Sequence, residues 1–138
     1  MRTNLLLSVA LFFLLGVSAG QAQVIIANSN VKISAISKAD LKEIFIGASS
    51  NFSDGTRAVP VTLKDGAAHE AFLRSYIGKS EAAFRASWRS IVFAGQGTMP
   101  RAFESELALI DYVASAPGAI GYVTAPVSRE KVKTLSVK

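Results

Sequence analysis

The sequence predicts an α/β domain with a central mixed sheet flanked by about four helices. Three observations favour this class. Short runs rich in Val, Ile and Thr alternate with longer amphipathic segments. Serine residues stand where the amphipathic segments begin, and Gly or Pro residues stand where they end. Strands that alternate with helices along a chain are typical of a sheet covered by helices.

The first half of the predicted domain carries two strands and one helix. The apolar run Val24–Ala27 predicts a buried strand near the start. Ser37 is expected to cap a helix that ends at Gly47, because glycine commonly follows the last helical turn. The buried face of this helix would carry Leu41, Ile44 and Phe45. A strand rich in Val and Thr is predicted over 58–63.

Three helices are predicted in the second half, over 67–77, 81–93 and 106–114. Ser80 and Ser105 are expected to cap the last two. Glu81 stands four residues before Arg85, which is a favourable spacing for an ion pair on one helix. The apolar positions expected to face the core are Ala68, Phe72, Leu73, Tyr76, Phe84, Trp88, Ile91, Val92, Leu107, Ile110 and Val113.

The remaining segments of the second half are a loop and two strands. The segment 95–100 contains two glycines and a proline and is interpreted as a loop. Strands are predicted over 119–123 and 132–137, after the helix has ended at Pro117-Gly118.

Residues 1–22 are predicted to be a cleavable secretory signal peptide. Arg2 supplies positive charge, Leu5–Val17 is an apolar run, and Gly20-Gln21-Ala22 has the small residues that precede a cleavage site. Cleavage is expected after Ala22, with a cut after Ala19 as the main alternative. An uncleaved anchor is disfavoured because the apolar run is shorter than the roughly 20 residues of a spanning helix. The sequence therefore predicts a periplasmic protein with a single domain over 23–138.

Composition excludes several classes of function. The chain has no cysteine and one histidine, which excludes thiol chemistry and disfavours a zinc site. Its 15 Lys and Arg against 10 Asp and Glu leave a modest positive charge that favours anionic ligands. The cations are scattered and form no Lys/Arg-rich run, so no nucleic-acid partner is expected. Ser34, Ser37 and Ser53 do not lie in a G-x-S-x-G sequence, and we predict no enzyme, no metal and no cofactor.

The candidate ligand site is the turn between the strand that ends at residue 63 and the helix that begins near residue 67. Backbone N–H groups at a helix start are unpaired, and the helix dipole there favours negative charge. Such a position can hold phosphate or sulfate. The residues expected to contact the anion are Lys64, Asp65, Gly66, Ala67, Ala68 and His69, with Arg101 converging on them from beyond the glycine loop.

Each charged member of this set also has an ordinary structural explanation, which for Asp65-Gly66 is the chemistry of a turn. Lys64 fits a solvated turn lysine, and His69 fits a surface or half-buried position. Arg101 would then pair with Glu104 or Glu106.

Several motifs occur in an order that is typical of one protein family. The segment 41–47 reads Leu-Lys-Glu-Ile-Phe-Ile-Gly, and Asp54-Gly55 and Lys64-Asp65-Gly66 follow it. Trp88, Phe93-x-Gly95 and Pro100-Arg101 come next, and 117–123 reads Pro-Gly-Ala-Ile-Gly-Tyr-Val. From about residue 24 to residue 127 the chain resembles the phosphate-type solute-binding proteins of periplasmic ABC importers, in particular their short, single-lobe members.

The resemblance implies one lobe of a type II periplasmic-binding-protein fold. Family members that bind phosphate carry a run like Arg-Ser-Asp-Gly-Ser-Gly-Thr at the anion loop, where this chain has residues 63–69. Asp65 and Gly66 match that run. Leu63 stands at the arginine position, and Ala67 and His69 stand at the two hydroxyl positions. An arginine fork and two hydroxyl donors are therefore replaced in this chain.

Two functions follow from the resemblance and from these replacements. The first is an exported binding module for a small oxyanion such as phosphate, working with an ABC transporter or another envelope protein. The alternative is a protein-interaction domain of the envelope that has kept the fold and lost the anion site.

Overall fold

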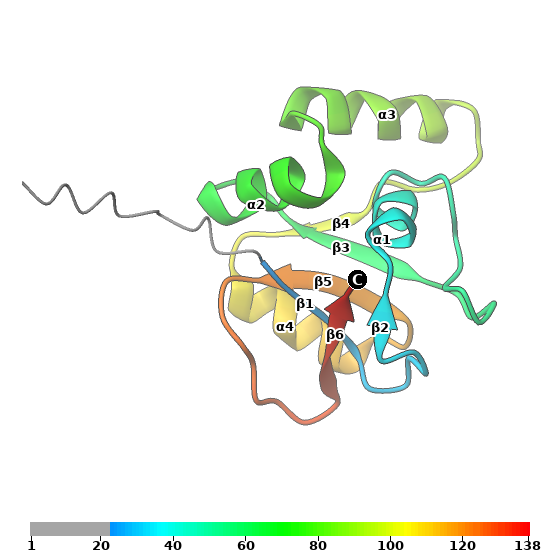
Figure 1. Ribbon diagram of the computed structural model, residues 1–138. Coiled ribbons are helices and arrows are strands. Elements are labelled where there is room, and N and C mark those ends of the chain that lie inside the picture. The colour runs from blue at the N-terminus through cyan, green and yellow to red at the C-terminus, as the bar shows by residue number, and fades with distance from the viewer. Residues whose placement is uncertain (1–22) are drawn as a thin grey trace, which may run out of the picture.

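A computed structural model describes residues 23–138 of the chain. The predicted signal peptide and its cleavage site lie at residues 1–22, outside the described residues. The domain is built on one six-stranded sheet with the strand order β2-β6-β1-β5-β3-β4 (Figure 1). No helix among residues 23–138 has the length and apolar character needed to cross a membrane.

The elements follow the predicted order closely. The strands are β1 (Val24–Asn28), β2 (Ala35–Ile36), β3 (Val59–Leu63), β4 (Arg101–Phe103), β5 (Ala119–Val123) and β6 (Val132–Val137). The α-helices are α1 (Lys38–Phe45), α2 (Ala67–Phe72), α3 (Glu81–Phe93) and α4 (Glu106–Ser115), and a π-helical turn, η1 (Leu73–Ile77), continues α2.

Serine caps begin three of the helices, as the sequence predicts. The Ser37 hydroxyl accepts a hydrogen bond from the Asp40 N–H at 3.0 Å. Ser80 accepts one from the backbone of Ala83 at 3.2 Å, and Ser105 accepts one from Ala108 at 3.1 Å. Each hydroxyl thus pairs one backbone donor that has no partner within its helix.

The sheet is mixed, with a parallel side and an antiparallel side. β3 runs parallel to both β4 and β5. β1 lies between β5 and β6 and is antiparallel to both. β2 is parallel to β6 at the far edge. The mixed sheet and the helices of the prediction are therefore confirmed.

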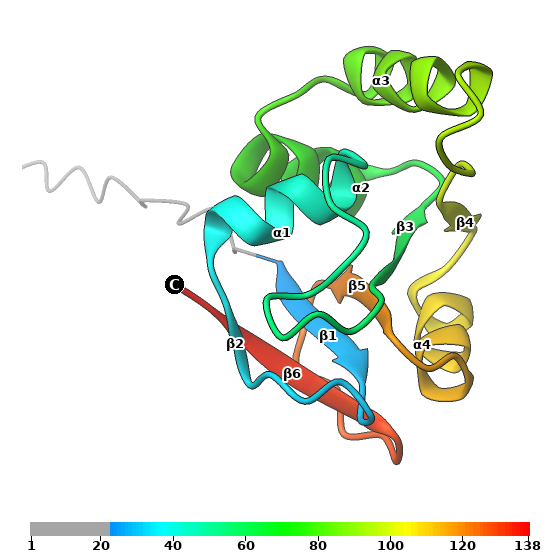
Figure 2. The ribbon, with the colours of Figure 1, turned by 90° about the vertical axis from the view of Figure 1, so that its right-hand side faces the viewer.

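Helices cover both faces of this sheet (Figure 2). Two neighbouring residues of β5 define the faces. A Cβ atom on Gly121 would lie 2.9 Å from Leu109 of α4. The next side chain, Tyr122, stacks on Phe72 of α2 with ring centroids 3.9 Å apart. Successive side chains of a strand point to opposite faces, so α4 covers one face and α1 and α2 cover the other.

The structure corrects three details of the expected helices. The segment 67–77 is not one α-helix, because it widens into η1, where the Gly78 N–H reaches the Leu73 carbonyl five residues back at 2.6 Å. Val92 and Leu107 were expected on buried faces but are 44% and 65% exposed. Leu109 takes the core position in α4 instead, because that helix turns a different face to β5.

Two short strands were not predicted. β2 has two residues, and β4 has three. Both are edge strands whose backbone hydrogen bonds depend on a partner distant in sequence. The segment 95–100 forms no helix or strand, in agreement with its interpretation as a loop.

Candidate functional site

A groove of about 450 Å³ lies beside the carboxyl end of β3. We call it the His69 groove. Ligands of open α/β sheets commonly bind at this end of the parallel strands. The charged and titratable side chains that line it are Lys64, His69, Glu81, Arg85, Arg89 and Glu104.

The predicted turn contributes only its two ends to the His69 groove. Lys64 and His69 line it, whereas residues 65–68 do not. Asp65, Gly66 and Ala67 are exposed, and Ala68 is half-buried.

Gly66 sets the geometry of the turn. It precedes α2 with φ 98° and ψ 173°. This backbone conformation is available to glycine and is strained for other residues.

Lys64 extends from the end of β3 to the edge of the groove. Its Nζ atom lies 3.2 Å from Oε1 of Glu104, and both side chains are mostly exposed. An exposed ion pair of this kind is weak, so an anion could replace Glu104 as the partner of Lys64 at little cost.

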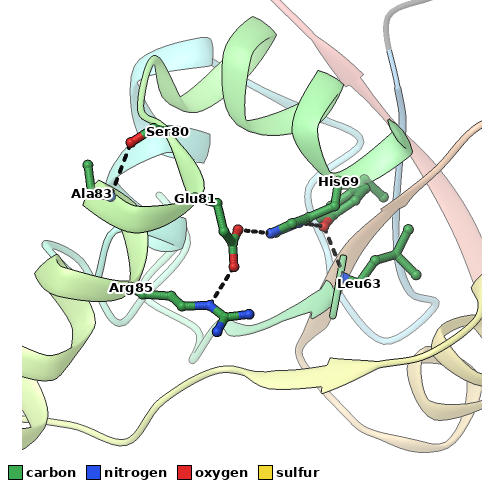
Figure 3. A network of polar contacts seen from close by, with 7 residues as sticks. Leu63, His69, Ser80, Glu81, Ala83 and Arg85 are labelled. Carbon is green, nitrogen blue, oxygen red and sulfur yellow. Dashed lines mark hydrogen bonds and ion pairs between the residues drawn. The ribbon is translucent and has the colours of Figure 1, made fainter. Parts of the chain in front are cut away.

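His69 is buried, with 2% of its surface exposed, which corrects the expectation of a surface or half-buried side chain. Its Nδ1 atom hydrogen-bonds the Tyr122 hydroxyl, and its Nε2 atom hydrogen-bonds Oε2 of Glu81 (Figure 3). The other carboxylate oxygen of Glu81 accepts a hydrogen bond from Nε of Arg85 at 2.5 Å. The Glu81–Arg85 pair expected from the sequence is therefore present.

One arrangement of protons satisfies this whole network. The Leu63 N–H donates to the Tyr122 oxygen at 3.0 Å, which leaves the Tyr122 hydroxyl hydrogen to donate to His69 Nδ1. His69 then donates from Nε2 to Glu81. Burial raises the pKa of Tyr122 well above its ordinary value, with a further contribution from the negative charge of Glu81, so the phenol stays protonated. The network therefore holds His69 and Glu81, two of the residues that line the groove, in fixed positions.

Arg101 is not brought to the Lys64–His69 turn. It lies opposite Val61 at the start of β4, and it lines a different pocket. Its guanidinium lies 5.4 Å from the ring centroid of Phe103 and 5.1 Å from that of Tyr112. The alternative ion pair is also wrong, because Glu104 pairs with Lys64 and Glu106 accepts hydrogen bonds from Thr124.

Sequence reasoning missed the contribution of α3 to the groove. Glu81, Arg85 and Arg89 are spaced four residues apart, so they follow one another along the same side of the helix. This spacing was visible in the sequence, but nothing local indicated that this side of α3 faces the turn after β3. Tyr122 was also missed, because its role depends on the contact with His69.

Among residues 23–138, no group of three His, Asp or Glu side chains is placed to hold a metal ion. His69 itself has both ring nitrogens engaged by Tyr122 and Glu81.

Comparison with known proteins gives a result at the level of the fold. No family model and no curated protein matches the chain. A solved structure of a candidate phosphate ABC transporter substrate-binding protein from Clostridium perfringens, with bound phosphate, aligns with a TM-score of 0.64 and 18% identity. An ABC-type phosphate transport receptor from Vibrio cholerae aligns with a TM-score of 0.55 and 12% identity.

The alignments cover most of this chain and less than half of each neighbour. They include 84% of this chain in both cases, and 44% and 46% of the neighbours. At these identities the shared property is the fold. The chain thus has the fold of one lobe of a periplasmic-binding protein.

Proposed function

We propose that this protein is an exported, single-lobe binding module that holds a small oxyanion, with phosphate as the first candidate, in the His69 groove. The observation that carries the proposal is the position of the groove. It lies at the carboxyl end of β3 in a fold shared with two phosphate-binding or phosphate-transport proteins. The groove is lined by three cations and two carboxylates, so an anion would balance its charge.

Arg89 is the principal anion ligand in this proposal. It lines the groove and forms no ion pair with any carboxylate of residues 23–138. A guanidinium can bind phosphate through two parallel hydrogen bonds, which replaces the missing arginine of the turn with one from α3. Lys64 adds a second positive charge. His69 holds the wall in place and is not a ligand, since both its nitrogens are occupied.

The proposed partner is a second protein surface that closes the open side of the groove. Two-lobed receptors enclose their ligands between lobes, and this chain spans less than half the length of the two neighbours. A component of an ABC transporter would provide such a surface in the periplasm.

A thermal-shift screen of the purified protein against phosphate, sulfate and related oxyanions tests the binding. A ligand at 100 times its Kd stabilises a fold by about 2.7 kcal/mol, which raises Tm by several degrees. We expect Arg89→Gln and Lys64→Gln to reduce this shift. Lys42→Gln, an exposed cation on α1 outside the groove, is the matched control. A screen in which no oxyanion raises Tm would reject the proposed function.

Export is tested separately by expressing the full chain and measuring the mass of the protein recovered from the periplasm. A mature protein that begins at Gln23 is expected. Retention of the full-length chain in the membrane fraction would contradict the proposed leader.

A further inference from the structure

A second pocket, of about 360 Å³, lies near the amino end of β3. We call it the Trp88 pocket. Residues of α1, α3, β4 and α4 and of the loop before β4 line it. Met99 and Pro100 line both this pocket and the His69 groove, so the two are neighbours separated by that loop. Its volume falls within the range of sites for small molecules.

The charge of the Trp88 pocket differs from that of the groove. Arg57 and Arg101 line the pocket, and no Asp or Glu does. Neither arginine forms an ion pair with a carboxylate of residues 23–138. In the groove, by contrast, Lys64 and Arg85 are each paired with a glutamate. Two guanidiniums without carboxylates give the pocket the stronger uncompensated positive charge of the two sites.

Arg101 is already held in position. Its guanidinium lies over the ring of Tyr112, which itself lines the pocket, and beside Phe103. These distances are within the range of cation–π attraction. The aromatic rings leave the N–H groups at the edge of the guanidinium available for an anionic group.

An apolar wall also lines the pocket. It is formed by Ile91 of α3 and by Met99, which is 44% exposed, with the 6% exposed Trp88 behind them. Two glycines allow the loops to approach this wall closely. A Cβ atom at Gly47 would lie 2.5 Å from Ile91, and one at Gly97 would lie 3.1 Å from the same side chain. Thr98 and Gln96 add hydrogen-bonding groups at the rim.

We infer that the Trp88 pocket is a second binding site, specific for a small organic anion. The acid group of the ligand binds Arg57 and Arg101, and an apolar body lies against Ile91 and Met99, next to Trp88. This chemistry separates the ligand from a bare oxyanion, which has no apolar surface to place on these side chains. The inference is independent of the proposed function, because it involves none of the charged residues of the His69 groove.

Three probes separate the contribution of the charge to binding from that of the apolar body. Phenyl phosphate carries both the charge and the apolar body, inorganic phosphate carries only the charge, and phenol carries only the body. Trp88 is the single tryptophan of the chain, so a titration followed by tryptophan fluorescence reports directly on the wall of the pocket. Isothermal titration supplies the Kd of each probe.

Phenyl phosphate is expected to change the fluorescence of Trp88 and to bind this site about tenfold or more tightly than either partial probe. Arg101→Gln and Arg57→Gln should each weaken this binding by about tenfold or more. Arg74→Gln, at an exposed arginine of η1 that lines neither the pocket nor the groove, is the matched control and should leave it unchanged. Gly97→Ala narrows the pocket without altering its charge and should weaken phenyl phosphate selectively. Circular dichroism of each variant verifies that the fold is intact.

Two results would overturn the inference. One is the absence of saturable phenyl phosphate binding at millimolar concentration. The other is binding that Arg89→Gln abolishes and Arg101→Gln does not, since this would place the ligand in the groove. The proposed function stands or falls separately, on the response of Tm to inorganic oxyanions.

Discussion

Helices α3 and α4 are attached to the domain in different ways. α4 places Leu109 and Val113 against the sheet, and both are fully buried. α3 lies farther from the sheet, beyond α2 (Figure 1). It buries Phe84 and Trp88, whereas Phe93 at its end is 96% exposed.

Specific polar bonds also attach α3 to the rest of the domain. The Trp88 indole N–H donates to the Phe45 carbonyl at the end of α1 at 2.8 Å. Glu81, in the first turn, hydrogen-bonds the buried His69. Residues of α3 line both the His69 groove and the Trp88 pocket. The comparison indicates that α4 packs on the sheet itself, whereas α3 is attached through Phe45 of α1 and His69 of α2.

The largest effect is expected from removing apolar contact under α4. Leu109→Ala should lower the free energy of unfolding by about 2–5 kcal/mol, because the side chain is fully buried between α4 and β5. Leu107→Ala, two residues away and 65% exposed, is the matched control and should change it by no more than about 0.5 kcal/mol. Urea unfolding measures both. Equal effects would contradict the assigned face of α4.

Tyr122→Phe is expected to cause the second-largest loss in the free energy of unfolding. It leaves two buried groups without their partner, the Leu63 N–H and Nδ1 of His69, and each unsatisfied group costs about 1–3 kcal/mol.

The same substitution should change how stability depends on pH. Burial raises the pKa of Tyr122 above the ordinary 10.0, so above about pH 10 the unfolded chain loses a proton that the folded chain keeps. Stability therefore falls as pH rises past 10, and the phenylalanine variant should show a shallower alkaline decline in urea titrations. An identical decline in both proteins would show that Tyr122 does not contribute to it.

Trp88→Phe should act locally. It keeps an aromatic ring but leaves the Phe45 carbonyl without its donor, at a cost of about 1–3 kcal/mol for one group. Hydrogen exchange should quicken in α3 while the amides of β1 and β5 keep their protection. Phe93→Ala, on the same helix and exposed, should change neither the stability nor the hydrogen exchange of α3. Equal acceleration throughout the domain would mean that α3 unfolds only with the core.

The smallest effect is expected at the surface of α3. Arg85→Gln removes an exposed partner of Glu81 four residues away, and such pairs contribute about 0.3–0.5 kcal/mol. The loss should shrink further in high salt, because the pair is screened. A loss above about 1 kcal/mol would indicate that Arg85 supports the Glu81–His69 bond as well.

Local signals explain what could be predicted from the sequence. The serine caps and the strands β1, β3, β5 and β6 each rest on residues that are close in the chain, so their patterns were visible. β2 and β4 have two and three residues and exist only because β6 and β3 offer paired backbones. A run of that length carries no periodicity of its own.

The candidate site was less accessible to prediction because it combines distant segments. His69 is buried through Tyr122, which lies 53 positions later, and through Glu81 on the next helix. The position of Arg101 depends on the register of β4 against β3, which sets its distance from the turn. Neither the register of two strands nor a tertiary contact can be predicted from the local sequence pattern.

The placement of β1 has a consequence for the order of folding. Both neighbours of this first strand, β5 and β6, come from residues 119–137 at the other end of the domain. The middle of the sheet therefore cannot assemble until nearly the whole chain has been synthesised, and pairing between such distant segments is slow. The strand at the centre of the sheet is thus the first to be synthesised and among the last to find its partners.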